Sequence, residues 1–255
     1  MDVSIILVNY NTKQLTSDCI QSIVEKTSGV EYEIILVDNA STDGSKEVFE
    51  SDERVLYIYS DKNGGFGYAN NLGMKVAKGK YFFLLNSDTL LVNNAIREFF
   101  DYAENITPET VLGCYLEGDD GTYRNSFFYF PAFTIWQFVK RNLYGQNLTP
   151  DYTDREVECV SGADMFIPRS AIDAAGMFDE NIFLYGEEGE LQYRMMQKGI
   201  KRMLINAPKI IHLEGQSSGG TARNLYGMKS HFYILKKHMN ICTYWLARMF
   251  YKLHP

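Results

Sequence analysis

Cysteine is scarce in this sequence, and no leader-like segment opens it. The four cysteines, at positions 19, 114, 159 and 242, are scattered and form no Cys-x-x-Cys pair, which argues against the disulfide framework of a small secreted domain. The apolar run 3–8 has no basic segment before it and is too short for a signal peptide or a membrane span. We therefore expect the protein to stay in the reducing cytoplasm.

Positive charge is in short supply over most of the chain. The 25 Lys and Arg residues face 32 Asp and Glu residues, which gives a net charge of −7. General nucleic-acid binding needs a basic face that neutralises phosphates, so we expect no nucleic-acid partner. Residues 215–255 are an exception, because they hold six basic side chains and no Asp or Glu.

The 255 residues suit one large domain, and their pattern alternates between strands and helices. This alternation predicts an α/β fold with an open, mostly parallel sheet flanked by helices, whose ligands bind beyond the carboxyl ends of the strands. We expect strands at 3–9, 32–38, 54–59, 80–86 and near 202–212, and helices at 13–26, 43–51, 66–77, 93–104, from Arg169, and at about 187–198, with regular structure resuming at 157–168 after an irregular segment.

Two carboxylates follow predicted strands at that edge. Asp38 ends the strand 32–38 and precedes capping residues, so it is either a turn former or a ligand of a nucleotide's base or ribose. Asp88 follows the strand 80–86, and a divalent cation that bridges two phosphates takes one or two such carboxylates from the protein. Turn formation is again the alternative for Asp88.

A glycine-rich turn, Asn63-Gly64-Gly65-Phe66-Gly67, leads into the helix between these two sites. Such a turn lets backbone approach a ligand closely, and a helix start favours anionic groups. The first strand is followed by Asn9-Tyr10-Asn11-Thr12 instead of the fingerprint Gly-x-Gly-x-x-Gly, which disfavours a dehydrogenase. The same turn lacks the glycine- and arginine-rich loop that a nucleotidyltransferase needs.

Three glutamates gather at a predicted helix start, in Tyr185-Gly186-Glu187-Glu188-Gly189-Glu190. Acids there complement the helix dipole, but the aromatic residues before them would also desolvate one acid and raise its pKa toward that of a general base. His212 ends a predicted strand and is either structural or a metal ligand. The aromatic run 127–131 lies in an irregular segment, 118–156, and either holds substrate or covers one edge of the sheet.

In chain order these motifs resemble glycosyltransferase family 2, and Phe183-x-Tyr185-x-Glu187 resembles its rhamnosyltransferase-like branch. The resemblance implies the GT-A fold, that of nucleotide-diphospho-sugar transferases, and an inverting glycosyltransferase of the hexosyltransferase type. Such an enzyme moves a sugar, with rhamnose favoured, from UDP, dTDP or GDP to a saccharide or lipid-linked acceptor in bacterial surface polysaccharide synthesis. The matching stretches are 8–11, 37–45, 63–73, 86–89, 176–191 and His212-x-x-Gly215-x-Ser217.

The resemblance also implies roles for individual residues. Glu188, with Glu187 beside it, would take a proton from an acceptor hydroxyl, which attacks the anomeric carbon opposite the leaving nucleoside diphosphate and inverts its configuration. Asp88 and His212 would hold a divalent Mn²⁺ or Mg²⁺ ion. The acceptor contacts would be Gly162, Ala163, Asp164 and Tyr185. The nucleotide-sugar contacts would be Val8, Asn9, Tyr10, Asn11, Asp38, Asn63, Gly65, Phe66, Asn70, Asn86, Ser87 and Asp88.

Two positions depart from the family pattern. Asn86 stands where the metal motif often begins with a second Asp, so the metal site would hold less negative charge. Glu188 stands where the catalytic Asp is usual and is one methylene longer, and a misplacement of about 1 Å can cost on the order of a hundredfold in rate. A catalytically silent nucleotide- or glycan-binding module on the same fold is the alternative.

We expect the GT-A domain at 1–228, with a nucleotide-sugar half at about 1–117 and an acceptor half at about 118–228, and a helical tail at 229–255. The tail either lies on an anionic membrane surface, as a peripheral contact on the inner face of the cytoplasmic membrane, or packs on the domain or in a homodimer interface. Packing is slightly favoured, because an aromatic stripe is more often core. The apolar residues at helical spacing are Leu235, Met239, Cys242, Leu246, Phe250 and Leu253.

Overall fold

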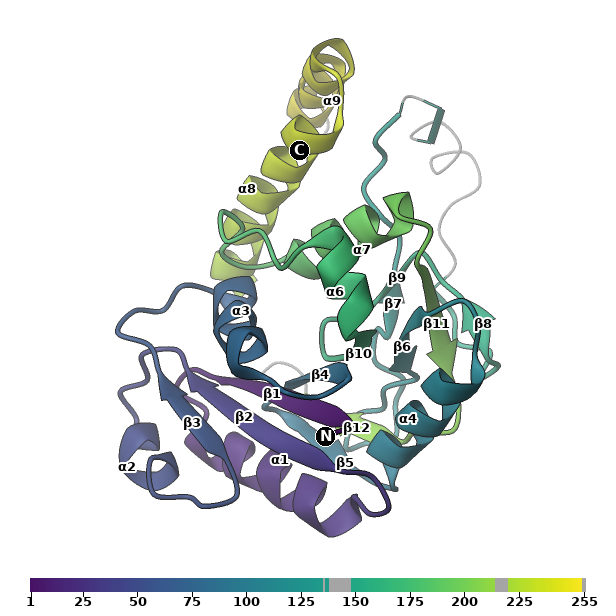
Figure 1. Ribbon diagram of the computed structural model, residues 1–255. Coiled ribbons are helices and arrows are strands. Elements are labelled where there is room, and N and C mark those ends of the chain that lie inside the picture. The colour runs from purple at the N-terminus through teal and green to yellow at the C-terminus, as the bar shows by residue number, and fades with distance from the viewer. Residues whose placement is uncertain (135, 138–147, 214–219, 254–255) are drawn as a thin grey trace.

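The fold, seen in a computed structural model, is a large mixed sheet with helices on both faces (Figure 1). The structure describes residues 1–134, 136–137, 148–213 and 220–253. The strands are β1 Val3–Asn9, β2 Tyr32–Asp38, β3 Leu56–Tyr59, β4 Tyr81–Asn86, β5 Thr89–Leu91, β6 Thr110–Cys114, β7 Phe127–Phe128, β8 Arg155–Glu156, β9 Cys159–Val160, β10 Asp164–Pro168, β11 Lys201–Ile205 and β12 Ile210–His212. The helices are α1 Lys13–Lys26, α2 Ser45–Phe49, α3 Phe66–Val76, α4 Ala95–Asn105, α6 Arg169–Ala175, α7 Glu187–Gln197, α8 Gly220–His238 and α9 Ile241–Leu253.

The large sheet has eight strands in the order β3-β2-β1-β4-β10-β6-β11-β8. The strands β3, β2, β1 and β4 are parallel, and so are β6 and β11. β10 runs antiparallel between β4 and β6, and β8 runs antiparallel on the far edge. The prediction of an open, mostly parallel sheet is therefore confirmed, with a reversed strand at its centre.

Alternate residues of the central strands supply two cores, one on each face of the sheet. Ile5 and Leu7 of β1 pack with α1 and α4, whereas Ile6 between them packs with α3, α6 and α7. Successive side chains of a strand point to opposite faces, so a strand covered on both faces must be apolar throughout. Gly73 lets α3 lie close to the sheet, because a Cβ atom there would meet Ile6 at 2.5 Å.

Most predicted elements of the first half agree with the structure, including the bounds 3–9, 13–26 and 32–38. The helix expected at 43–51 is shorter, because it begins only after Gly44 and ends at Phe49. The stretch 202–212 is divided between two sheets, since β12 leaves the large sheet and pairs with β5. β5 was not predicted, and this pairing places His212 opposite Thr89.

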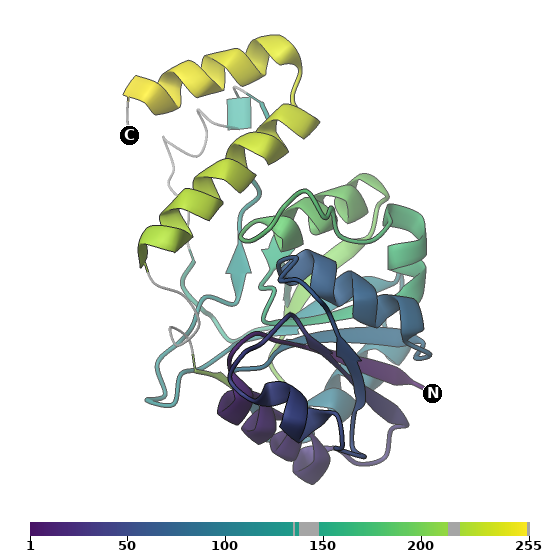
Figure 2. The same ribbon diagram turned by 90° about the vertical axis from the view of Figure 1, so that its left-hand side faces the viewer.

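The tail forms two helices instead of one. α8 ends at His238 and α9 begins at Ile241, with Asn240 between them accepting hydrogen bonds from the backbone N–H and hydroxyl of Thr243. An Asn in this position caps a new helix and so favours a break in the chain direction. In Figure 2 the two helices double back on each other and project beyond the α/β body. Ile234, Leu235 and Tyr244 form the buried side of this hairpin.

Candidate active site

The carboxyl ends of β1, β2 and β4 bring several predicted site residues together. Asn9 lies opposite Asp38 in the sheet register, and Val8 lies opposite Asn86. Asn9 is fully buried, donates to the Ser41 hydroxyl at 2.9 Å and accepts from the hydroxyls of Thr12 and Thr16. Its amide therefore holds the turn after β1 in place.

Asp38 is likewise fully buried and engaged within the protein. Its two carboxylate oxygens accept hydrogen bonds from the Ser41 backbone N–H and from the Tyr57 hydroxyl, both at 2.8 Å. Tyr10, by contrast, is 48% exposed, and the next residue, Asn11, has a positive φ of 56°. This turn exposes Tyr10 beyond the strand ends, where a nucleotide would lie.

The glycine turn before α3 contacts the acidic block directly. Gly65 has a φ of 89°, and a Cβ atom there would lie 1.9 Å from the carbonyl oxygen of Phe183. The same carbonyl accepts a hydrogen bond from the Phe66 backbone N–H at 3.3 Å. Asn63 accepts hydrogen bonds from the Asn39 amide and the Gly65 N–H, which fixes the turn. Only glycine fits both the conformation and the contact at position 65.

Asn70 lies one turn further along α3. Its amide donates to the Phe66 carbonyl at 3.0 Å, while its buried Oδ1 atom has no hydrogen-bond partner within the described part of the chain. A buried acceptor without a partner costs free energy unless a ligand or water satisfies it. The predicted role of Asn70 toward a ligand is consistent with this geometry.

Asp88 and His212 lie side by side, as a shared metal site would require. An Asp88 carboxylate oxygen is 3.3 Å from Nε2 of His212, and both residues are almost fully buried. Nε2 of His212 is also 3.4 Å from the Asn86 amide nitrogen, and the Leu213 N–H donates to the Asp88 carbonyl at 2.9 Å. The hydroxyl of Ser87 contacts that of Thr12 at 3.2 Å, which joins this group to the turn after β1.

The residues present fit a divalent ion that is shared with phosphates. One carboxylate and one imidazole are suitable ligands for Mn²⁺, and an ion of this kind takes its other oxygens from phosphate and water. Among the described residues, no group of three or more His, Cys, Asp and Glu side chains could enclose a metal by itself. Gly215 and Ser217 of the predicted histidine motif lie outside the described residues.

Glu187 and Glu188 differ in surroundings although they are neighbours at the start of α7. Glu187 is 4% exposed, and its Oε2 atom has no hydrogen-bond partner in the described ranges. Burial and the charge of Glu188 raise the pKa of Glu187 well above the usual range. Glu188 is partly exposed and accepts a hydrogen bond from the Gly186 N–H, and burial raises its pKa as well. Glu187 therefore holds a proton more firmly, and Glu188 is the carboxylate available as a base.

A cavity of about 240 Å³ opens beside Glu188. Its walls are the aromatic segment 128–131, the residues Tyr185 and Glu188, and the side of α8 that carries His231 and Ile234. Burial lowers the pKa of His231, which disfavours the charged form of its imidazole. Aromatic and apolar walls around one carboxylate are typical of a pocket that binds a small polar ligand such as a sugar ring. Residues 135 and 138–147 of the predicted insertion 118–156 lie outside the described residues.

The segment before β10 lies between the glutamates at the start of α7 and the Asp88–His212 group. A Cβ atom at Gly162 would lie 3.5 Å from the Glu188 side chain, and the Ala163 carbonyl accepts from the Asn86 N–H at 2.9 Å. Asp164 is different, since it is fully buried and accepts a hydrogen bond from the Cys114 N–H at 2.6 Å. Its other carboxylate oxygen, Oδ1, has no hydrogen-bond partner among the described residues, and the role of Asp164 as an acceptor contact stays a prediction.

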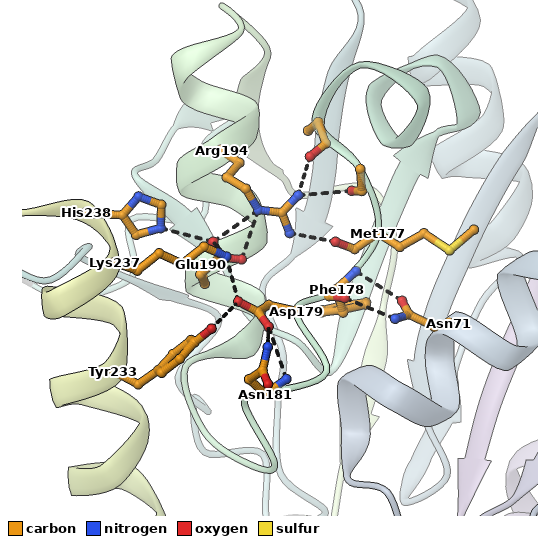
Figure 3. A network of polar contacts seen from close by, with 12 residues as sticks. Asn71, Met177, Phe178, Asp179, Asn181, Glu190, Arg194, Tyr233, Lys237 and His238 are labelled. Atoms are coloured by element: carbon orange, nitrogen blue, oxygen red, sulfur yellow. Dashed lines mark hydrogen bonds and ion pairs between the residues drawn. The ribbon is translucent and has the colours of Figure 1, made fainter.

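A polar network around Glu190 was not predicted as part of the site (Figure 3). Glu190 accepts two hydrogen bonds from Arg194, and it pairs with Lys237 at 2.8 Å and with His238 at 3.0 Å. Lys237 also pairs with Asp179 at 2.6 Å. Burial alone would raise the pKa of Glu190 and Asp179, but these partners hold both below the usual range. The i,i+4 spacing of Glu190 and Arg194 was a visible signal, whereas Lys237 had none.

The model of the family described as Glycosyl transferase family 2 matches residues 4–174, which is more than half of the chain. The chain belongs to glycosyltransferase family 2. The matched residues include the turn after β1, Asp38, the glycine turn and Asp88, and they end before the acidic block. The family predicted from the sequence is thereby confirmed, while its rhamnosyltransferase-like branch stays a prediction.

Curated family 2 relatives resemble part of the chain. Glycosyltransferase GlyG of Streptococcus pneumoniae serotype 4 is 32% identical over 131 residues, which cover 50% of this chain and 43% of the relative. The poly(ribitol-phosphate) beta-glucosyltransferase of Bacillus spizizenii is 34% identical over 119 residues, which cover 44% of this chain and 19% of the relative. In both cases the chain matches less than half of the relative's length.

Solved structures share the fold of this family 2 chain over most of its length. A structure of GalNAc-T7 with UDP, GalNAc and Mn²⁺ has a TM-score of 0.69 and 17% identity, and covers 92% of this chain and 48% of its own. The mannosyltransferase PcManGT from Pyrobaculum calidifontis, in complex with GDP-Man and Mn²⁺, has a TM-score of 0.67 and 14% identity, and covers 93% and 65%. These likenesses confirm the predicted GT-A fold.

Proposed function

We propose that this chain is an inverting glycosyltransferase that moves a sugar from a nucleoside diphosphate to a hydroxyl of a saccharide or lipid-linked acceptor. One observation carries the proposal: Gly162 and Ala163 join a glutamate of raised pKa to the Asp88–His212 pair. A direct displacement needs these two functions, a base and a diphosphate site, within one sugar's reach of each other.

The donor site follows from the carboxyl edge of the sheet. Tyr10 and Asn11 would contact the nucleoside, in a turn that Asp38 shapes through Ser41. The start of α3, with Gly65 and Phe66, would face the donor's anionic groups. Asp88 and His212 would hold a Mn²⁺ or Mg²⁺ ion, which when bound neutralises the charge that develops on the leaving diphosphate. The neighbouring structures that bind UDP or GDP-Man with Mn²⁺ support this assignment.

The acceptor site would be the cavity beside Glu188. A hydroxyl held against Tyr185 and the segment 128–131 would give its proton to the Glu188 carboxylate and attack the anomeric carbon. The diphosphate would leave from the opposite face of the sugar, so one displacement inverts the configuration. Protonated Glu187 would keep the pair at a single negative charge.

The donor sugar and the acceptor are the finer parts of the proposal. Rhamnose remains the favoured sugar, because the block from Phe183 to Glu187 resembles the rhamnosyltransferase-like branch. The relative from Bacillus spizizenii, named for glucosyl transfer to poly(ribitol-phosphate), supports a role in bacterial surface polysaccharide synthesis. UDP-glucose and dTDP-rhamnose are therefore the first donors to test.

The test is release of nucleoside diphosphate from a panel of UDP-, dTDP- and GDP-sugars, with Mn²⁺ or Mg²⁺ and with saccharide acceptors. Release from one donor that needs the ion and is lost in Asp88→Ala supports the proposal. Asp18→Ala, the same change at an exposed position on α1, is the matched control and should leave the rate unchanged. If nucleotides bind but no donor turns over, the proposal fails, and a catalytically silent binding module is the better reading.

A further inference from the structure

One side of α9 is apolar and faces outward. Tyr244 packs inward with Ile234 and Leu235 of α8. Ile241, Trp245 and Met249, each four residues apart and so on one face of the helix, are 61%, 53% and 61% exposed. This packing uses only one side of α9. A second side of α9 carries large apolar side chains in contact with solvent.

This exposed face continues onto α8. The guanidinium of Arg248 lies 5.5 Å from the ring centre of Trp245 and 5.8 Å from that of Phe232 on α8. One helical turn from Phe232, Met228 is 61% exposed, and Lys229 and Lys236 on the same stripe are exposed as well. We call this surface the hairpin face and define it by Met228, Lys229, Lys236, Trp245, Arg248 and Met249.

The charge of the hairpin face has one sign. Residues 215–255 contain no Asp or Glu, and Lys229, Lys236 and Arg248 are exposed cations. Lys237 is engaged by Asp179 and Glu190 and is not part of this surface. Apolar side chains with a Trp among them, flanked by cations, match the depth profile of an anionic bilayer, whose headgroups attract Lys and Arg while its acyl boundary accepts apolar groups.

We propose that the hairpin face binds an anionic membrane surface, with α9 lying flat in the interface. Within the described ranges, no helix is both long and apolar enough to cross a bilayer, so the contact would be with one leaflet. The proposal stands on the surface of the hairpin and does not need the transfer reaction. It places the cavity beside Glu188, which α8 helps to line, near a membrane.

A second copy of the chain is a poorer occupant for this face. A two-fold interface pairs a surface with itself, which would bring the cations of one copy, Lys229, Lys236 and Arg248, against the same cationic surface of the other. The hairpin has no carboxylate to neutralise them, because residues 215–255 contain none. Like charges that meet in an interface cost several kcal/mol, whereas anionic lipids would offset the same charges.

The experiment measures co-sedimentation of the full chain with two kinds of vesicle, phosphatidylcholine alone and phosphatidylcholine mixed with phosphatidylglycerol. We expect binding to the mixed vesicles that weakens as salt is added. The charge variant Lys229→Glu/Lys236→Glu should bind at least about 25-fold more weakly, since each cation near such a surface accounts for roughly fivefold. The apolar variant Trp245→Gln/Met249→Gln introduces a good helix former at both positions and should also lose binding.

Matched control variants make the same kinds of substitution at exposed positions outside the hairpin face. Lys26→Glu/Lys198→Glu changes two exposed cations on α1 and after α7, and Val24→Gln/Val76→Gln changes two exposed valines. Both should bind as the parent chain does, and thermal unfolding of every variant checks its fold. Absence of binding to the mixed vesicles, or equal loss in controls and hairpin variants, overturns the proposal. So does a dimer in sedimentation velocity that the apolar variant dissociates while vesicle binding is unchanged.

Discussion

At the scale of single residues, the adjacent side chains Glu187 and Glu188 of α7 differ in burial and therefore in protonation. Glu187 is buried without a partner for one oxygen in the described part of the chain, while Glu188 lines the cavity. Two carboxylates this close do not both ionise readily, and the one with less solvent keeps its proton. The sequence predicted both as an acidic pair, but the difference in burial depends on how the chain folds around them.

Glu188→Gln is expected to lower kcat by about 10²- to 10⁴-fold, because it removes the proton acceptor. Glu187→Gln should keep most activity, since glutamine resembles the protonated acid that the raised pKa of Glu187 favours. Steady-state kinetics of both variants against the donor that turns over provide the measurement. Equal losses in the two variants would contradict the assignment of Glu188 as the base.

The pH dependence of kcat/KM should report the same carboxylate. Burial raises the pKa of Glu188, and a base acts only when ionised, so activity should rise with pH through a value above the ordinary glutamate pKa of about 4.3. A rise centred at or below that value would contradict the environment described for α7. The profile is measured with saturating metal, to keep metal binding out of the titration.

The pKa of Asp164 leads to a prediction about stability. Whereas Glu188 must be ionised to act as a base, ionisation of Asp164 should destabilise the folded state. Burial raises its pKa from 3.8 to about 7, so the folded state holds a proton that the unfolded state releases between these values. Stability should therefore fall as pH rises from about 4 to about 7 and then level off, by up to about 4 kcal/mol. Asp164→Asn should remove this fall, measured by urea unfolding at a series of pH values. Parallel curves for both proteins would contradict the prediction.

At the scale of elements, the glycine turn shows how far sequence patterns reach. The turn and the start of α3 were predicted at residue 66, where the helix begins. The partner of Gly65, the Phe183 carbonyl, could not be predicted, because it lies more than a hundred residues along the chain. The sequence likewise predicted Asp88 and His212 as metal ligands, but their proximity depends on the unpredicted pairing of β12 with β5. Local sequence determines where a turn or a helix begins, whereas the tertiary fold determines which distant residues it contacts.

Gly65→Ala should therefore do more harm than a strained backbone alone. A Cβ atom would force the Phe183 carbonyl away and so separate the turn from the acidic block. Gly121→Ala is the control, because Gly121 also has a positive φ, of 74°, but open space around it. We expect a loss of about 1 to 2 kcal/mol in the control and a larger loss in Gly65→Ala. Urea unfolding and donor binding are the measurements, and equal losses would contradict the proposed contact.

At the scale of the whole molecule, ion pairs connect the tail to the domain. Lys237 of α8 contacts Asp179 and Glu190, whose side chains are 10% and 0% exposed (Figure 3). Tyr233 adds a hydrogen bond to Asp179 at 3.0 Å. The predicted apolar stripe at positions 242 and 246 faces solvent instead of packing on the body. The spacing of apolar residues alone could not reveal that Lys237 pairs with two buried carboxylates where α8 docks.

Lys237→Met should destabilise the fold by about 2 to 3 kcal/mol, because it leaves two carboxylates without their shared cation. This loss is smaller than the roughly 3 to 5 kcal/mol for a fully buried pair, since Lys237 is 33% exposed. Lys236→Met, the exposed neighbour, is the control and should change little. The pKa values of Asp179 and Glu190 lie below normal, so this contribution is present above about pH 4 and lost as pH falls. Urea unfolding at a series of pH values measures the difference in stability between the parent chain and Lys237→Met. A difference that does not shrink at low pH would contradict this role of Lys237.

The reversed strand β10 also has a consequence for synthesis. It lies between β4 and β6, so the two parallel parts of the sheet cannot join until residue 164 and its successors have left the ribosome. Until then the edge of β4, with the sequence Tyr-Phe-Phe-Leu-Leu-Asn, has no neighbour on that side. The wait from residue 86 to residue 164 amounts to roughly 4 to 16 s of elongation. During that time this apolar edge is an open template for mispairing with another chain.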